Sequence, residues 1–143
     1  DKLVREIIEE RPELHAPQAV IEVKHPLLPV IGHDASLTQC LTNLLDNAVK
    51  FVAPDTTPHV RVFTEQRDGH VRISVRDNGI GIDPEGQQRL FAAFQRLAGA
   101  QGYKGTGVGL AIVRKAAERM QGRVGVDSAP GRGSTFWVEL PKA

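Results

Sequence analysis

The chain has 143 residues, of which 41% are hydrophobic and 24% are charged, values close to the averages of globular proteins. Its 18 Lys and Arg against 17 Asp and Glu give a formal net charge of +1, which argues against a domain that wraps nucleic acid and against an acidic disordered tail. The single cysteine, Cys40, excludes a disulfide framework and a cysteine-based zinc site. No apolar run reaches the roughly 18 residues of a membrane span. The chain opens at Asp1 in a helical pattern, so we expect one domain, 1–143, cut from a longer protein.

Hydrophobic periodicity predicts the elements of the first half in chain order. Apolar residues at 3, 4, 7 and 8 predict a helix that ends near Arg11-Pro12, and short strands are expected at 19–23 and 29–31. A continuous apolar stripe predicts a helix over 37–52, with Asp34 or Ser36 as its cap. Alternation over 59–75 around Asp68-Gly69 predicts a β-hairpin.

The second half continues the alternation of helices and strands. We expect a short helix at 84–93, a mobile loop over 98–109 with five glycines, and a helix over 108–120 ended by Gly122. A final hairpin is expected to pair 124 and 126 with 136, 138 and 140. Together these elements predict an α+β fold. It is a two-layer sandwich in which about three helices cover one face of a mixed, mostly antiparallel sheet of about five strands.

The long central helix carries a polar stripe opposite its apolar one. Asn43, Asn47 and Lys50 are spaced i, i+4 and i+7, which places them on one face. A solvated helix face is the ordinary explanation, but asparagine is a poor helix former, so two of them in mid-helix indicate another purpose. A carboxamide oxygen is a good ligand for Mg²⁺ that already carries phosphate, and a lysine suits phosphate.

Asp77 ends the second strand of the predicted hairpin, with Gly79 and Gly81 directly after it. An ionised carboxylate only accepts hydrogen bonds, so it can bind a purine amino group but not a keto oxygen. Glycines allow backbone to pass close to a flat ligand. An ordinary turn is an equally good interpretation of these residues taken alone.

Gly105, Gly107 and Gly109 precede or open a predicted helix, where backbone N–H groups and the helix dipole favour an anion. A dinucleotide fingerprint, with Asp127 as the ribose-binding acid, fails because the spacing is GxGxG and no strand precedes it. A P-loop fails because no Lys-Ser or Lys-Thr follows the glycines. A flexible linker into a helix is the remaining alternative.

The order of these motifs is more specific than any one of them. Residues 43–51 (NLLDNAVKF), 77–82 (DNGIGI), 90–97 (LFAAFQRL) and 105–112 (GTGVGLAI) resemble the N, G1, F and G2 boxes of one family, and 133–136 (GSTF) follow. The family is that of the catalytic ATP-binding domains of sensor histidine kinases, in the Bergerat-fold superfamily that includes gyrase, Hsp90 and MutL. The resemblance covers nearly the whole chain.

The resemblance implies a role for each matching residue. Asn47 is the side-chain ligand of Mg²⁺, Asn43 lies beside the phosphates and Lys50 contacts phosphate oxygens. Asp77 accepts a hydrogen bond from the adenine amino group, and Ser134 supports that end of the site. Arg96 is a candidate to reach the γ-phosphate, which makes the implied catalytic set Asn43, Asn47, Lys50 and Arg96. The other implied cofactor-binding residues belong to the G1 box and the lid over the nucleotide: Gly79, Gly81, Ile82, Tyr103, Lys104, Gly105, Thr106, Gly107, Val108, Gly109 and Leu110.

The implied activity is transfer of the γ-phosphoryl group of ATP to a histidine, with ATP and Mg²⁺ as cofactors. The family's phosphoacceptor histidine is followed by an acidic residue and a proline. Only His33-Asp34 begins this way, and the sequence then departs from the pattern. The acceptor is therefore expected on a separate dimerisation domain, so this fragment is expected to be a monomer that binds ATP without autophosphorylating.

The expected partners are that phosphoacceptor domain and a response regulator receiver domain, in two-component signal transduction. Nucleic acid and direct membrane contact are not expected. The location is expected to be cytoplasmic, with the parent protein, implied to be a homodimer, either free or anchored in the inner membrane.

Hydrolysing relatives place a glutamate one turn before the Mg²⁺-binding asparagine, where it acts as a general base. This chain has Asn43 there, which predicts negligible ATP hydrolysis. Two alternatives stay open: a serine kinase of the anti-sigma-factor type, and a degenerate nucleotide-binding platform.

Overall fold

Two antiparallel hairpins, joined side by side, supply four of the five strands of the sheet. A computed structural model describes residues 2–14, 19–50, 56–79, 106–128 and 131–143, and at Glu13, Lys50 and 106–112 it describes the backbone alone. The sheet order is β1-β2-β3-β5-β4, with β1 parallel to β2 and all other neighbours antiparallel. The described elements are α1 (Lys2–Glu9), the 3₁₀ turn η1 (Pro12–Leu14), β1 (Val20–Val23), α2 (Asp34–Lys50), β2 (His59–Arg67), β3 (His70–Asp77), α4 (Thr106–Arg119), β4 (Arg123–Ser128) and β5 (Ser134–Pro141).

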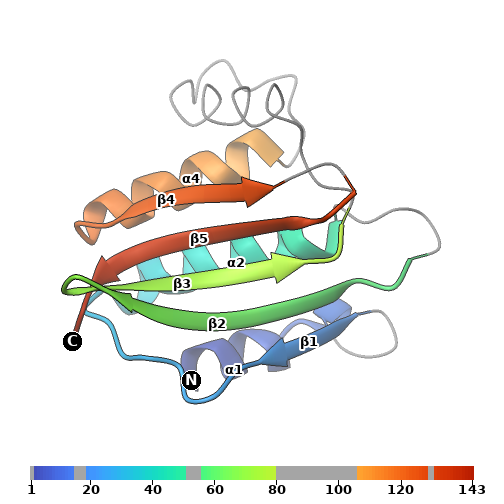
Figure 1. Cartoon of the computed structure of the whole chain (residues 1–143), viewed down its shortest axis with the longest axis horizontal. Helices are drawn as coiled ribbons and strands as arrows, with labels where there is room; N and C mark the ends of the chain where they lie inside the picture. Colours follow the sequence, from blue (N-terminus) through green and yellow to red (C-terminus); the bar gives the residue numbers. More distant parts are fainter. Residues whose placement is uncertain (1, 15–18, 51–55, 80–105, 129–130) are drawn as a thin grey trace.

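All three described α-helices lie behind the same face of the sheet (Figure 1). Alternation along the strands turns one apolar set toward them, because successive side chains of a strand point to opposite faces. The helices contribute one apolar stripe each. The buried core comprises mainly Val60, Val62, Val71, Ile73, Val75, Phe136, Val138 and Leu140 of the sheet, with Val4, Ile7, Leu41, Leu44, Leu45, Ala48, Val113, Ala116 and Ala117 of the helices. The two-layer α+β architecture predicted from the sequence is confirmed.

The first hairpin turns at the dipeptide that the sequence indicated. Asp68 and Gly69 both have positive φ, 48° and 82°, as a two-residue turn of the primed type requires. The second hairpin also has the expected register, with Val124 opposite Val138 and Val126 opposite Phe136. Both hairpins are confirmed.

Two of the predicted boundaries in the first half are wrong. The strand expected at 29–31 is reduced to an isolated bridge between Val30 and Lys142, because the apolar run is too short to form a ladder. The long helix starts at Asp34, since the N–H of Leu37 already donates to the carbonyl of His33 at 2.8 Å. Asp34 is therefore inside the first turn, and neither it nor Ser36 precedes the helix as its cap.

The ends of α4 also differ from the expectation. The helix starts at Thr106, so Gly107 and Gly109 belong to its first turn and not to a preceding loop. At its other end the left-handed residue is Gln121, with φ 60°, and not Gly122. The N–H of Gly122 donates to the carbonyl of Ala117 at 2.8 Å, which is the Schellman pattern. Gly122 is needed for another reason: a Cβ there would overlap the carbonyl oxygen of Glu139.

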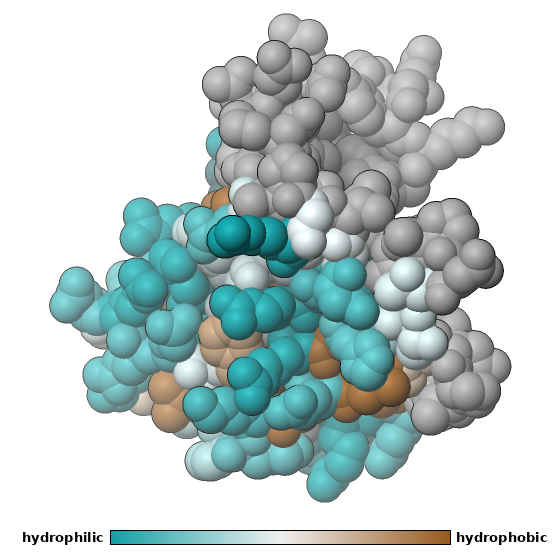
Figure 2. All heavy atoms as spheres, turned by 45° about the vertical axis from the view of Figure 1, so that its right-hand side comes forward, coloured by the Kyte–Doolittle hydropathy of each residue, from teal (hydrophilic) through white to brown (hydrophobic). Residues whose placement is uncertain are grey.

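Within the part of the chain that the structure describes, no helix is both long and apolar enough to cross a membrane. Apart from the residues drawn in grey, the surface seen in Figure 2 is mostly hydrophilic, and its apolar residues form small separate patches.

Candidate nucleotide site

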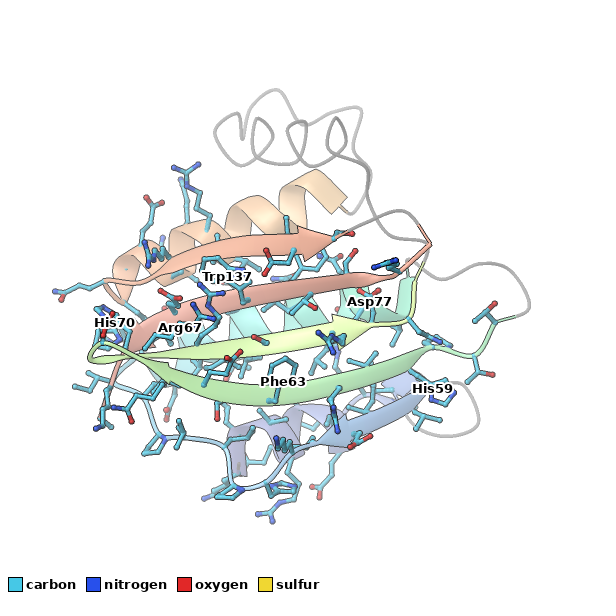
Figure 3. The ribbon with its side chains drawn as sticks, viewed as in Figure 1. His59, Phe63, Arg67, His70, Asp77 and Trp137 are labelled. Carbon is cyan, nitrogen blue, oxygen red and sulfur yellow. The ribbon has the colours of Figure 1, made fainter. Side chains whose placement is uncertain are left out.

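Four predicted motif-bearing segments converge at one end of the sheet. The carboxyl end of β3, the carboxyl end of α2 and the amino end of α4 lie at the same end of the molecule, on the right in Figure 1. Asp77 occupies the last position of β3 there (Figure 3). The start of β5, with Ser134, completes the group. Residues far apart in the sequence are thus brought to one place.

Asp77 is held by two backbone donors, one just after the end of β3 and the other at the start of β5. Its Oδ1 accepts the N–H of Gly79 at 2.8 Å and the N–H of Ser134 at 3.0 Å. The side chain follows the inward alternation of Val71, Ile73 and Val75, so it points toward the helix-covered side. Only 4% of the residue is exposed. The carboxylate is therefore fixed in orientation by main-chain groups.

The second oxygen of Asp77, Oδ2, is buried and has no hydrogen-bond partner among the described residues. Burial raises the pKa of this carboxyl above its ordinary value, and the hydrogen bonds from Gly79 and Ser134 oppose the rise. Oδ2 can receive a donor from a ligand, such as an exocyclic amino group.

The turn before β5 packs against the backbone of Asp77. Gly133, in this turn, is a residue of the site that the sequence analysis did not predict. It has φ 74°, and a Cβ there would overlap the carbonyl oxygen of Asp77. Next to it, the hydroxyls of Ser128 and Ser134 share a hydrogen bond of 2.7 Å, and Ser128 Oγ donates to the Gly133 carbonyl at 2.9 Å. The Gly-x-Gly-Ser-Thr sequence was the available signal, because two closely spaced glycines before a strand indicate a required close approach.

Asn78 ties the end of β3 to the start of β2, a role that the sequence did not reveal. Its Oδ1 accepts the N–H of His59 at 2.8 Å, and its Nδ2 donates to the carbonyl of Thr57 at 3.1 Å. In the Asp-Asn-Gly segment, the side chain of Asp77 therefore belongs to the candidate site, and that of Asn78 holds the backbone of neighbouring segments together.

The polar stripe of α2 is divided between a buried and a partly exposed asparagine. Asn47 is 3% exposed, and its Nδ2 is buried with no partner among the described residues. Asn43 lies one turn earlier, is partly exposed, and donates its Nδ2 to the carbonyl of Gln39 at 2.9 Å. Lys50 ends the helix. The two asparagines therefore differ. The side-chain N–H group of Asn43 has a partner, whereas that of Asn47 is buried without one among the described residues.

The amino end of α4 lies at the same end of the sheet. The first four N–H groups of a helix have no partner within it, so the segment that begins at Thr106 presents donors together with the positive end of the helix dipole. Gly107 and Gly109 lie inside this first turn. Their N–H groups are therefore among the unpaired donors that can bind an anion. Eight residues of the motifs predicted from the sequence lie outside the described residues: Gly81, Ile82, Phe91, Phe94, Arg96, Tyr103, Lys104 and Gly105.

The described residues contain no group of three or more His, Cys, Asp or Glu side chains that could hold a metal ion. They therefore give no support for a metal bound by protein side chains alone. The chemistry of Asn47 fits a different arrangement. Mg²⁺ usually keeps several waters and binds through one or two protein oxygens together with the phosphates of its substrate. A single buried carboxamide is sufficient for that.

Comparison with known proteins agrees with this geometry. The sequence profile of the family described as histidine kinase-, DNA gyrase B- and HSP90-like ATPases matches residues 32–143. The phytochrome-like protein Cph1 of Synechocystis sp. is 42% identical over 112 residues, which are 78% of this chain and 15% of that protein. The solved structure of the mycobacterial sensor histidine kinase MprB superposes with a TM-score of 0.76 at 30% identity, covering 99% of this chain and 94% of that one. Full-length ShkA in complex with AMPPNP gives a TM-score of 0.76 at 36% identity, covering 99% of this chain and 30% of that one.

The chain belongs to the histidine kinase-, DNA gyrase B- and HSP90-like ATPase family. Within that family it is a catalytic ATP-binding domain of the sensor histidine kinase type. It spans 15% of the length of the first curated relatives that it matches.

Proposed function

We propose that this domain binds Mg²⁺-ATP and donates the γ-phosphoryl group to a histidine on a separate phosphoacceptor domain, in two-component signalling. The observation that carries the proposal is the buried Oδ2 of Asp77, which has no hydrogen-bond partner within the described part of the chain. A buried acceptor without a donor costs about 1–3 kcal/mol, so its retention favours a site completed by a ligand. A carboxylate accepts from the amino group of adenine and would repel the keto oxygen of guanine, which supports ATP over GTP.

The phosphate end of the site is assigned to α2 and α4. Asn47 would supply a carboxamide oxygen to Mg²⁺, and the N–H groups that open α4 would receive phosphate oxygens. Asn43, Lys50 and Arg96 are proposed to contact the phosphates from the remaining sides. When bound, Mg²⁺ offsets the charge that builds on the phosphate oxygens. Phosphoryl transfer needs positioning and charge stabilisation more than covalent chemistry from the protein, and these side chains are of the types that provide both.

The accepting histidine is proposed to lie outside residues 1–143, on the dimerisation domain of a longer parent protein. His33 is exposed and directly precedes α2, where its carbonyl accepts the first hydrogen bond of the helix. Its sequence context also departs from that of family phosphoacceptors. This arrangement supports a scaffold role for residue 33. We further propose that a response regulator is the final recipient of the phosphoryl group.

Calorimetric titration with a non-hydrolysable ATP analogue tests the proposal, with and without Mg²⁺ and against the matching GTP analogue. We expect adenine-selective binding that Mg²⁺ strengthens and that Asp77→Asn removes, because an amide in place of Oδ2 presents a donor to the purine amino group. Asp127→Asn is the matched control, since Asp127 is an exposed aspartate on β4. It should bind as the wild type does.

Two results would contradict the proposal. One is a folded wild-type chain that binds no adenine nucleotide, which would favour the degenerate platform. The other is equal binding of the adenine and guanine analogues with no effect of Asp77→Asn.

A further inference from the structure

A two-point ion pair joins the N-terminal segment to the helix that carries Asn47. Arg11 Nε lies 3.2 Å from Asp46 Oδ1, and Arg11 Nη2 lies 2.5 Å from Asp46 Oδ2. The two side chains are 32% and 24% exposed, compared with 49% and 65% for the surface pair of Arg61 with Glu22. Bidentate, partly buried pairs of this kind are stronger and better oriented than ordinary surface pairs.

Arg11 projects from a segment that is itself well seated. Its N–H donates to the carbonyl of Ile8 at 3.2 Å, and its carbonyl accepts the N–H of Leu14 at 2.9 Å. Val4, Ile7 and Leu14 on either side of it are buried in the core. The packed turn between α1 and η1 therefore fixes the backbone of Arg11 at a position from which its guanidinium reaches Asp46.

Asp46 occupies a position where a carboxylate is unfavourable. It lies in the last two turns of α2, near the negative end of the helix dipole, and it directly precedes Asn47. The only other carboxylate of this helix, Asp34, is at the opposite end. Positions 46 and 50 are also one turn apart, the spacing at which an acid and a lysine pair in helices generally. An uncompensated carboxylate here would repel a polyphosphate and compete with it for Lys50.

We propose that Arg11 is a positioning residue of the nucleotide site: by occupying both oxygens of Asp46, it prevents this carboxylate from repelling the phosphates or pairing with Lys50. The inference rests on the proposed function. If Arg11 has this role, the affinity for the triphosphate depends on how the segment from α1 to η1 packs on the core. That segment is distant in sequence from every nucleotide-binding motif.

The test is calorimetric titration of the whole chain with the Mg²⁺ complex of the non-hydrolysable ATP analogue, using Arg11→Met, Asp46→Asn and the double variant. We expect Arg11→Met to bind about fivefold more weakly, the order of effect of one unpaired charge near a polyphosphate at a protein surface. Asp46→Asn should bind at least as tightly as the wild type. The double variant should return to within about twofold of the wild type, because its carboxylate is gone.

The three variants separate this role from a purely structural one. All three variants lose the same ion pair, so a purely structural role predicts weaker binding in all three, whereas the proposed role predicts weaker binding in Arg11→Met alone. The deficit of Arg11→Met should also shrink in about 0.5 M salt, where the screening length falls to roughly 4 Å. Arg67→Met is the matched control, since it removes an exposed arginine, paired with Glu65 at 3.8 Å, from the far end of β2.

The proposal is overturned if Asp46→Asn binds as weakly as Arg11→Met, if the double variant stays weak, or if salt leaves the deficit unchanged. Should Arg11→Met fail to fold, Arg11→Lys, which keeps the charge and loses the two-point geometry, should show a smaller deficit of the same salt dependence. A wild-type chain that binds no nucleotide would instead contradict the proposed function, so the two failures are distinguishable.

Discussion

Replacement of Gly133 by alanine tests how closely the turn before β5 and the candidate adenine site depend on each other. Gly133 has φ 74°, and an added Cβ would overlap the carbonyl oxygen of Asp77, lying also 3.1 Å from its carbonyl carbon and 3.3 Å from the Cα of Asn78. Gly131 is a matched control in the same turn. It has φ 76°, and nothing lies within 4 Å of a Cβ placed on it.

The two substitutions share one energetic term and differ in another. The left-handed conformation costs a residue with a Cβ roughly 1–2 kcal/mol, and this applies equally to Gly131→Ala and Gly133→Ala. Only Gly133→Ala must also push the backbone of Asp77 away, which is a buried steric conflict of about 2 kcal/mol or more. We therefore expect losses of stability of about 1 kcal/mol for Gly131→Ala and about 3 kcal/mol or more for Gly133→Ala.

Urea unfolding measures the stability difference, and titration with the ATP analogue measures the effect on the site. Displacement of Asp77 should weaken the hydrogen bond from Ser134 and lower the affinity for the analogue by about tenfold, which corresponds to about 1.4 kcal/mol. Gly131→Ala should keep the wild-type affinity. Equal losses of stability in the two variants, or full affinity in a folded Gly133→Ala chain, would refute the reasoning.

Three further predictions concern other groups. Burial alone raises the pKa of Glu139, but hydrogen bonds and charge from Arg72 and Arg123 outweigh it and leave the pKa below its ordinary value. The stability of the wild type relative to Glu139→Gln should therefore be fully present above the ordinary glutamate pKa and be lost as the pH falls through the lower folded value; a pH-independent difference in urea unfolding would contradict this. Burial raises the pKa of Cys40 to about 11, so a thiol reagent at about pH 8 should react slowly with the folded chain and rapidly in denaturant, and equal rates would show that the thiol is accessible. We expect negligible ATP hydrolysis by the isolated chain because Asn43 cannot act as a general base, and fast turnover that survives Asn43→Ala would overturn that expectation.

The sequence predicted the hairpins well because their signals are local. Asp68-Gly69 can adopt the positive φ values of a two-residue turn, and period-2 alternation on either side determines which residues face the helices. The predicted position of Asp77 at a strand end followed from the same alternation. Helix ends were harder to predict, because Gln121 adopts the left-handed conformation beside a glycine that would do so at lower cost.

What the sequence could not reveal depends on contacts between distant segments. Gly122 is kept small by the carbonyl of Glu139, and Gly133 by the carbonyl of Asp77. The pairing of Arg11 with Asp46 spans 35 positions and follows no periodic pattern. Such requirements appear only once the chain has folded and brought the partners together.

On the face of the sheet opposite the described helices, charged side chains of neighbouring strands lie beside one another. Glu65, Arg72, Glu139 and Arg123 stand in one row across four strands, with alternating sign. Arg72 and Arg123 donate to the two oxygens of Glu139 at 2.7 and 2.9 Å. In the adjacent row the guanidinium carbon of Arg72 lies 3.8 Å from the centroid of the Trp137 ring. Trp137 is labelled on β5 in Figure 3. Arg72 and Arg123 thus pair with a carboxylate of the same face of the sheet.

On the helix-covered side, near Asp77 and Asn47, buried polar groups are left without partners among the described residues. Among the described residues, two buried side-chain polar atoms lack a partner, Asp77 Oδ2 and Asn47 Nδ2. Each costs about 1–3 kcal/mol, a large fraction of the stability of a domain of this size. Both belong to the motifs from which the sequence predicted a nucleotide site. A ligand that donates to Asp77 Oδ2 and accepts from Asn47 Nδ2 would recover this free energy, so a bound nucleotide should stabilise the fold.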